Sequence, residues 1–277
     1  MEPLALLAAL CKALDERARE VERAEEWYEG DHPIPLPPPT TAAASQREAR
    51  IAFETMARLG VTNFIPPIVD VPAASLRVEG FRFAGSPVSS DAEAWTIWQR
   101  NFMDADSDLA IKTALKTGQA FALVWADADG LATITVEDPE QCIVMYEAGS
   151  RRKRKAGLKR WTDETGGVCA TLYTAEAVYK FRQTRNDSTG KVEWLPREID
   201  GEAWPLPNPY GFVPLVELRA NPELKASLFG GGEPEFAKQV NEQRKINQTV
   251  LNLLVTMEHQ SFRQRWVTGW GAPTKPD

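Results

Sequence analysis

Three alternating aspartates are the first residues in this sequence whose spacing suggests chemistry. Asp104, Asp106 and Asp108 could hold a hard cation, because such ions prefer clustered carboxylate oxygens. A calcium loop of the EF-hand type needs glycine at its sixth position and glutamate at its twelfth, where this sequence has Leu109 and Leu115. We therefore expect a solvated helix start here rather than a metal site.

The densest basic run lies at residues 151–155. Such runs can bind phosphate groups. This run falls between two predicted strands, so we interpret it as a charged loop and keep contact with DNA or a protein partner as the alternative. Its members are Arg151, Arg152, Lys153, Arg154 and Lys155.

No pattern for nucleotide binding or for an activated nucleophile is found. Gly190 and Lys191 lack the upstream glycine of a P-loop, and the glycine triplet at residues 230–232 has no P-loop lysine beside it. His32 and His259 accompany no serine or cysteine nucleophile motif, and without paired cysteines they make no zinc site. We therefore expect a non-enzymatic protein with no cofactor and no metal.

Asp70 is the remaining candidate for catalysis, because it stands alone among apolar residues. A lone carboxylate in such a place more often caps a helix or accepts backbone hydrogen bonds. A metal-dependent hydrolase or nuclease that uses Asp70 or the aspartates at 104–108 is kept as a rival interpretation.

The composition is that of a folded, acidic protein. Its 277 residues are 43% hydrophobic and 26% charged, with a net charge of −7. This charge argues against a freestanding nucleic-acid binder, although a protein that lets DNA pass without holding it is allowed. Three scattered cysteines indicate a reducing cytoplasm, and with no long apolar run or basic leader we expect no membrane contact and synthesis in a cytosol.

The first third of the chain is predicted to be helical. An amphipathic helix is expected over residues 3–29, followed by a Pro-rich arm at 31–41 that is interpreted as a surface connector, with a binding segment as the alternative. Further helices are expected over 45–59, within 63–76, from 91 and over 106–118. Trp95, Trp98 and Phe102 have the spacing of core residues.

From residue 119 the hydrophobic period changes to that of strands. Six or seven short β-branched or aromatic runs alternate with turn clusters as far as residue 195, and one more strand follows a Pro-bounded loop. This pattern predicts an antiparallel meander. Together with the N-terminal helices it predicts an α+β fold.

A long helix is predicted over residues 233–265, after the glycine triplet, which we interpret as a hinge. Pro234 suits its first turn, and no glycine or proline follows until Gly269. Apolar residues crowd its later half, whereas amides and charges fill its middle. A helix in a single core would need an apolar stripe along its whole length, so we expect contacts with copies of itself or a wall facing water. A helix lying across its own domain is the alternative.

The order of several motifs resembles the portal proteins of long-tailed bacteriophages, in the branch common among phages of actinobacteria. The clearest segment covers residues 208–221, where NPYGFVPLVEL precedes the long helix. Six other motifs occur in the matching order, from about Trp27 to Gly269: EEWYEGDHPIPLPPP, SLRVEGFRF, AWTIWQ, ALKTGQAFALVW, EDPEQCIVMY and RQRWVTG.

The resemblance implies a ring, typically a dodecamer, at one vertex of the capsid. Double-stranded DNA passes through it without sequence specificity, and its expected partners are terminase, neck proteins, and the major capsid and scaffolding proteins. The implied division is an N-terminal helix and arm at 1–44, an α+β wing at 45–232, a stem helix at 233–265 and the start of a clip at 266–277. Family members continue beyond this point, so the chain is expected to be the N-terminal part of a portal protein found in the virion and made in the host cytoplasm.

Within the predicted stem helix, two groups of residues are expected to face other molecules. The apolar group is expected to pack between subunits: Val250, Leu253, Leu254 and Met257. The polar group is expected to face the channel or a neighbouring subunit: Asn241, Arg244, Lys245, Gln248 and Asn252. A monomeric scaffold or adaptor that binds partners through the Pro-rich arm is the second rival interpretation.

Overall fold

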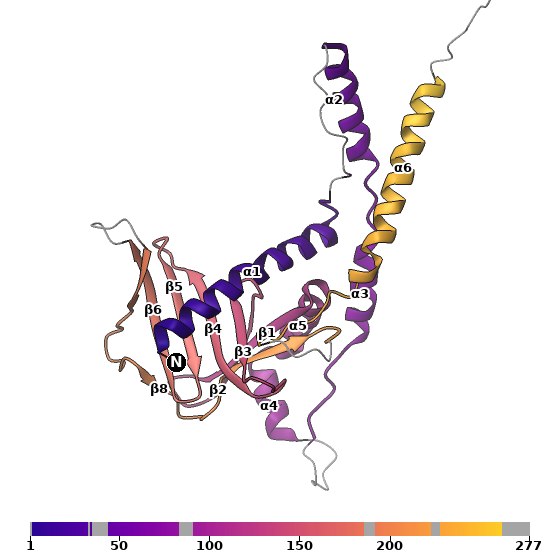
Figure 1. The fold of residues 1–277 in the computed structure, drawn as a ribbon. Coiled ribbons are helices and arrows are strands. Elements are labelled where there is room, and N and C mark those ends of the chain that lie inside the picture. Colours follow the sequence, from indigo (N-terminus) through magenta and orange to yellow (C-terminus); the bar gives the residue numbers. More distant parts are fainter. Residues whose placement is uncertain are drawn as a thin grey trace, which may run out of the picture. The chain divides into compact units, whose positions relative to one another are not determined.

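The computed structural model describes residues 2–32, 34, 44–82, 91–185, 192–222 and 228–261. The chain divides into two compact units (Figure 1). Unit 1 comprises Met1–Glu29 and Ile65–Lys238, and unit 2 comprises Gly30–Phe64 and Gln239–Asp277. This grouping differs from the linear division expected from the sequence, because the second helix joins the last one instead of the strands.

Helices account for most of the N-terminal part, as predicted. The helices of unit 1 are α1 (Pro3–Glu29), α3 (Ile65–Ser75), α4 (Ala92–Arg100) and α5 (Met103–Thr117). Unit 2 contains α2 (Ala44–Leu59) and α6 (Val240–Ser261), and a short 3₁₀ turn, Ala237–Gln239, spans the boundary between the units.

The strands confirm the predicted α+β class but form two sheets instead of one meander. The first sheet has the order β2-β1-β9, with β1 Gln119–Ala126, β2 Ala132–Glu137 and β9 Leu215–Arg219. The second has the order β3-β4-β5-β6-β7, and β8 pairs with β6. Its strands are β3 Cys142–Tyr146, β4 Arg154–Thr162, β5 Val168–Thr174, β6 Ala177–Arg185, β7 Val192–Pro196 and β8 Leu206–Pro207.

The meander breaks between β2 and β3 because β1 takes its second neighbour from far along the chain. Phe121 of β1 lies opposite Glu137 on one side and Glu217 of β9 on the other. The turn after β2 then leads to the other sheet, with the Asp138 carboxylate accepting the Glu140 N–H at 2.8 Å. A pairing across some 90 residues leaves no local sequence pattern. The predicted antiparallel meander is therefore found in β3 to β7, while β1 and β2 belong to the other sheet.

Among the described residues of unit 1, apolar side chains pack into cores at two places. In the first, α1 lies against the larger sheet (Figure 1), and Leu7, Leu10 and Leu14 are fully buried against strand residues such as Leu158 and Phe181. Their three-four spacing puts one face of α1 on the sheet. The second core fills the space between the two sheets and includes Phe121, Val144, Tyr173, Val213 and Leu215.

The prediction that α4 carries core residues was wrong. The helix has no buried residue, and Phe102, immediately after it, is 78% exposed with a φ of 55°. Polar bonds attach this region to the edge of β2 instead. The Asn101 amide donates to Ala132 O at 3.0 Å and accepts from Ile134 N at 2.9 Å, which satisfies backbone groups that an edge strand leaves open.

The last helix begins later than predicted. Residues 233–236 are not helical, because their N–H groups donate to carbonyl groups of other segments of unit 1. Glu233 N donates to Ala220 O at 3.1 Å, and Glu235 N donates to Leu115 O at 2.9 Å. The 3₁₀ turn at Ala237–Gln239 follows, and α6 runs from Val240. Residues 262–277, with the predicted helix end and the start of the clip, lie outside the described residues.

Candidate subunit interface

The glycine segment before the last helix belongs to unit 1 and is held there by contacts with β3 and β9. The Gly231 N–H donates to a Glu217 carboxylate oxygen at 2.6 Å, and Tyr146 N donates to Leu228 O at 2.6 Å. A Cβ on Gly232 would lie 1.9 Å from the carbonyl oxygen of Ala220. The interpretation of the triplet as a hinge was therefore wrong, because only glycine can approach the neighbouring backbone this closely.

A buried ion pair holds the segment in place. The Glu217 side chain is 0% exposed and forms a salt bridge with Arg219 at 2.8 Å, while the Tyr146 hydroxyl donates to it at 2.9 Å. The Arg219 guanidinium also lies 4.4 Å from the Tyr146 ring centroid. Burial, and then the negative charge of Glu217, raise the pKa of Tyr146 to about 12.

In unit 2, two amide side chains of α6 bind the extended segment that follows α2. Asn247 Oδ1 accepts from Thr62 N at 3.1 Å, from Thr62 Oγ1 at 2.9 Å and from Gln243 Nε2 at 2.8 Å. Gln243 also donates to Thr62 O at 2.8 Å and accepts from Phe64 N at 3.0 Å. Both amides are 3% exposed. We call Gln243, Asn247 and the Thr62 and Phe64 groups that they bind the amide clasp.

A small apolar core continues this contact toward the end of α6. Ile34, Ala57 and Leu251 are buried together, and the backbone of Leu251 lies 3.3 Å from the position of a Cβ on Gly60. Partly buried side chains surround them: Phe53, Met56, Val61 and Val255. One stripe of α6 is therefore polar in its first half and apolar in its second, and all of it faces its own unit.

A second stripe of α6 is apolar but exposed. Leu253 and Met257 are 57% and 58% exposed, and Ile246 is 39% exposed. With the half-buried Val250 they follow a four-three-four spacing, which is the seam of a helix that packs against other helices. We call these four residues the outer seam. Leu254 is half-buried on the border between the seam and the inner stripe.

The residues of the predicted polar group are all exposed along α6. Asn241, Lys245, Gln248 and Asn252 again repeat at four-three-four, which places them in one row, the polar row. This row lies about 140° around the helix from the outer seam, because each residue turns an α-helix by about 100°. Gln248 donates to Asn252 at 3.1 Å, and Lys245 forms a salt bridge with Glu242 at 2.8 Å. Arg244 is also exposed.

Sequence reasoning did not single out the amide clasp. It treated all the amides of the helix alike, as groups for solvent or for other copies. Gln243 and Asn247 turn inward, and the signal that could have shown this is their spacing of four residues from each other and from Leu251. Composition alone cannot separate a buried amide from an exposed one, because the difference lies in whether backbone partners are within reach.

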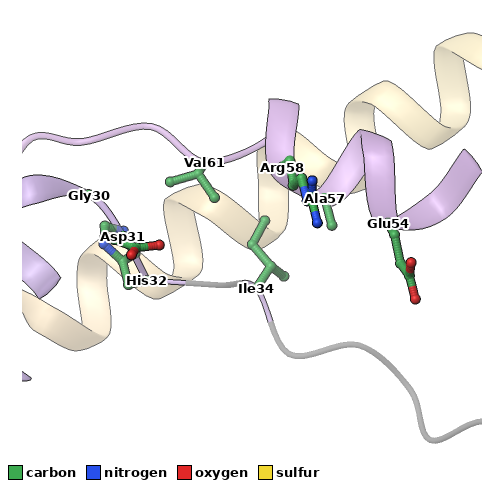
Figure 2. A pocket seen from close by; sticks show the side chains of 8 residues that line it. All are labelled: Gly30, Asp31, His32, Ile34, Glu54, Ala57, Arg58 and Val61. Carbon is green, nitrogen blue, oxygen red and sulfur yellow. The ribbon is translucent and has the colours of Figure 1, made fainter. Parts of the chain in front are cut away.

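Unit 2 also carries an open pocket of about 650 Å³. Figure 2 shows Ile34 and Val61 pointing into it, with Asp31 and His32 at one end and Arg58 beside Ala57. Glu54 and Gly30 complete its lining. Its lining combines apolar side chains, Ile34, Ala57 and Val61, with the charged residues Asp31, Glu54 and Arg58.

Residues 151–153 of the predicted basic loop lie between β3 and β4, as expected, whereas Arg154 and Lys155 are the first residues of β4. Lys153 forms a salt bridge with Glu147 at 2.9 Å. Arg154 donates from Nη1 to Leu215 O at 2.9 Å, so its side chain stabilises the contact between β4 and β9. Arg151 and Arg152 are exposed beside an open pocket of about 470 Å³, and Lys155 is exposed as well. A contact of this loop with DNA or a partner stays a prediction.

Neither of the acidic candidates is arranged for catalysis. Asp70 forms a salt bridge with Lys112 at 2.9 Å and accepts from the Tyr28 hydroxyl at 2.8 Å. Lys112 and then Tyr28 hold the pKa of Asp70 below its ordinary value, which is opposite to the shift that a general acid needs. Asp104 accepts from Trp98 Nε1 at 3.1 Å. Across the described residues, no three histidine, cysteine or acidic side chains gather closely enough to hold a metal ion.

The comparisons with known proteins agree with the resemblance seen in the sequence. The family model of the phage portal protein, SPP1 Gp6-like, matches residues 8–277. A search of curated proteins finds no match. The match covers nearly the whole chain and defines a structural, virion class of protein. The chain belongs to the phage portal protein family, SPP1 Gp6-like.

The family is structural and not enzymatic, in keeping with the paired state of Asp70. No helix among those described combines the length and apolar character needed to cross a membrane. The narrower placement with phages of actinobacteria stays a prediction.

Proposed function

We propose that this chain is a subunit of the portal ring at one capsid vertex, the channel through which double-stranded DNA enters and leaves. In this proposal, unit 1 forms the wing, α6 (Val240–Ser261) forms the stem helix, and residues 266–277 are the start of the clip, where terminase and neck proteins dock. The ring is a homo-oligomer, typically a dodecamer, and the wing faces the major capsid and scaffolding proteins. Membership of the portal family supports this assignment.

The observation that carries the proposal is the outer seam of α6. Its residues repeat like the seam of a helix bundle, yet unit 2 leaves Leu253 and Met257 more than half exposed. Exposed apolar rows on soluble proteins mark interaction sites. In a ring, the seam of one copy would meet a different surface of the next, a heterologous contact that closes after a fixed number of copies.

The polar row supports a place beside moving DNA. Each phosphate neutralised by lysine or arginine adds salt-dependent affinity, and affinity hinders sliding. Asn241, Gln248 and Asn252 carry no charge, and the charge of Lys245 is offset by Glu242 at 2.8 Å. We therefore infer that this row faces the channel and offers DNA a surface of low adhesion.

The test is the assembly state of a seam variant, measured by native mass spectrometry and light scattering. Leu253→Ser with Met257→Ser is expected to reduce multimers to monomers. The matched control is Val71→Ser with Leu109→Ser, which alters side chains of unit 1 that are 65% and 59% exposed and should leave assembly unchanged. A wild-type chain that stays monomeric at high concentration, or a seam variant that assembles normally, would contradict the proposal.

A further inference from the structure

A loop of unit 1 carries aromatic side chains that are partly exposed but are held in place by neighbouring rings and hydrogen bonds. Tyr210 and Phe212 are 38% and 51% exposed. Tyr210 meets Trp125 edge-on at 5.1 Å between ring centroids, and Phe212 follows at 5.9 Å from Tyr210. We call Trp125, Tyr210 and Phe212 the aromatic platform. Trp125 also lies 6.3 Å from Tyr173, so the platform continues outward from the core between the sheets.

One buried asparagine fixes the shape of this loop. Asn208 is 8% exposed, and its amide donates to Thr174 O at 2.7 Å and to Phe212 O at 2.8 Å. Its Oδ1 accepts from Tyr210 N at 3.1 Å. These bonds hold the loop that presents Tyr210 and Phe212, while neither ring is buried by it. Rigid aromatic side chains presented in this way are typical of binding hot spots.

The chemistry of the platform suits a proline-rich segment. Grooves lined by tryptophan and tyrosine bind polyproline II helices, because proline rings pack flat on aromatic faces and the ligand is ordered before it binds. None of the three platform side chains is charged, so a suitable partner is also uncharged. This chain contains such a sequence, since five of the seven residues 33–39 are proline and residues 33–43 carry no charge.

We propose that the aromatic platform binds the Pro-rich segment, residues 35–39, of a second copy of the chain. Ile34, just before this segment, is 6% exposed in the core of unit 2, so one end of the segment is anchored. At about 3.1 Å per residue, the five residues span roughly 15 Å in the polyproline II form, enough to contact all three rings at once. The platform chemistry is independent of the proposed function, whereas the choice of a second copy rests on the proposed ring.

The binding is tested with a labelled peptide of residues 31–43, titrated by fluorescence anisotropy. The protein is the chain with Pro35, Pro37, Pro38 and Pro39 changed to Ala, so that no resident segment competes, and with the seam substitutions, so that ring closure plays no part. Binding should weaken at least about tenfold on Phe212→Ser. Phe102→Ser, a change at an aromatic side chain that is 78% exposed elsewhere in unit 1, should leave it unchanged.

Two outcomes of this titration would overturn the proposal. One is no saturable binding of the peptide. The other is equal binding of a peptide in which the four prolines are alanine, since the platform would then recognise no polyproline conformation.

The source of the segment is tested separately by photo-crosslinking. A benzophenone amino acid replaces Phe212 in the otherwise wild-type chain, and isotopically heavy and light chains are mixed before irradiation. Crosslinks between heavy and light chains at residues 35–39 would support docking on a second copy. Crosslinks confined to single chains would mean that the segment docks on its own copy, and the assignment to a second copy would then be wrong.

Discussion

Unit 1 and unit 2 differ in the share of their buried contacts that is apolar. Unit 1 has two sheets with apolar cores that include fully buried leucine and phenylalanine residues. Unit 2 has a small apolar core beside two buried amides. Apolar packing tolerates small shifts, whereas the clasp is satisfied only when each donor meets its acceptor. The difference indicates that the clasp sets a defined register of α6, while the outer seam of the same helix stays exposed.

The largest effect is expected from adding a methyl group to Gly232, where two backbone segments of unit 1 come closest together. Gly232→Ala would place a Cβ 1.9 Å from Ala220 O and 2.5 Å from Gly118 O, so the segment must leave its place. We expect a loss of at least about 3 kcal/mol in the free energy of unfolding, measured with urea. Gly80→Ala is the control, because a Cβ there meets nothing within 4 Å. Equal stability of the two variants would show that the segment is not fixed.

The buried ion pair of unit 1 should give the next largest effect. Glu217→Gln leaves Arg219 without its countercharge in a site where Glu217 is 0% exposed, and we expect a loss of about 2–3 kcal/mol. Glu202→Gln removes a surface partner of Lys180 and should change stability by no more than about 0.5 kcal/mol. Urea unfolding of both variants compares them directly. Similar small losses would mean that the Glu217 pair contributes little.

In unit 2, the clasp should matter more than any exposed amide on the same helix. Asn247→Ala removes the acceptor shared by Thr62 N and Thr62 Oγ1 and one of the bonds of Gln243 Nε2, for an expected cost of about 2 kcal/mol. Hydrogen exchange at the Thr62 amide reports this opening locally. Asn252→Ala, which removes only an exposed contact with Gln248, is the matched control and should not change that exchange. Equal exchange in both variants would rule out the clasp as the element that fixes α6.

The smallest effect is expected at high pH and should be confined to unit 1. The pKa of Tyr146 is about 12 in the folded chain, above its ordinary value of 10. The associated stability is therefore complete below pH 10 and is lost as the pH rises toward 12, by about 1 kcal/mol at pH 11. Burial also raises the pKa of Cys142 and Tyr173, so the transition in wild type is broader than that of a single group. Tyr146→Phe should reduce the dependence of the free energy of unfolding on pH between pH 10 and 12. An unchanged dependence would show that Tyr146 does not cause the loss of stability.

Much of the fold could be predicted because its signals are local. The three-four spacing in α1 gave the observed bounds, Pro3–Glu29, and alternating apolar runs located seven strands in order. The pairing of β1 with β9 could not be predicted, because Phe121 and Glu217 are neighbours only in the folded sheet. The burial of α4 was also misjudged, since Trp95 and Trp98 have core spacing but lie half-exposed near each other, at 6.5 Å between ring centroids.

For the candidate interface, the sequence predicted the helix that carries it, but not which side of that helix is buried. It placed apolar residues in the later half of the helix, where Leu253 and Met257 are indeed exposed. It could not tell that Gln243 and Asn247 bind backbone groups of residues 62 and 64, because those partners lie some 180 residues earlier in the chain. The role of the exposed residues in subunit contact stays a prediction.

The interleaving of the two units has a consequence for biosynthesis. Residues 30–64 belong with residues from 239 onward, and the intervening 65–238 belong with α1. At roughly 5–20 residues per second, a ribosome needs about 10–35 s to add the residues that separate Phe64 from its partner Gln243. During that time the apolar side of α2 has no α6 to cover it, and α1 likewise waits for β4 to β6. The apolar faces of α1 and α2 are therefore uncovered during synthesis, and α6 completes the fold of a segment made long before.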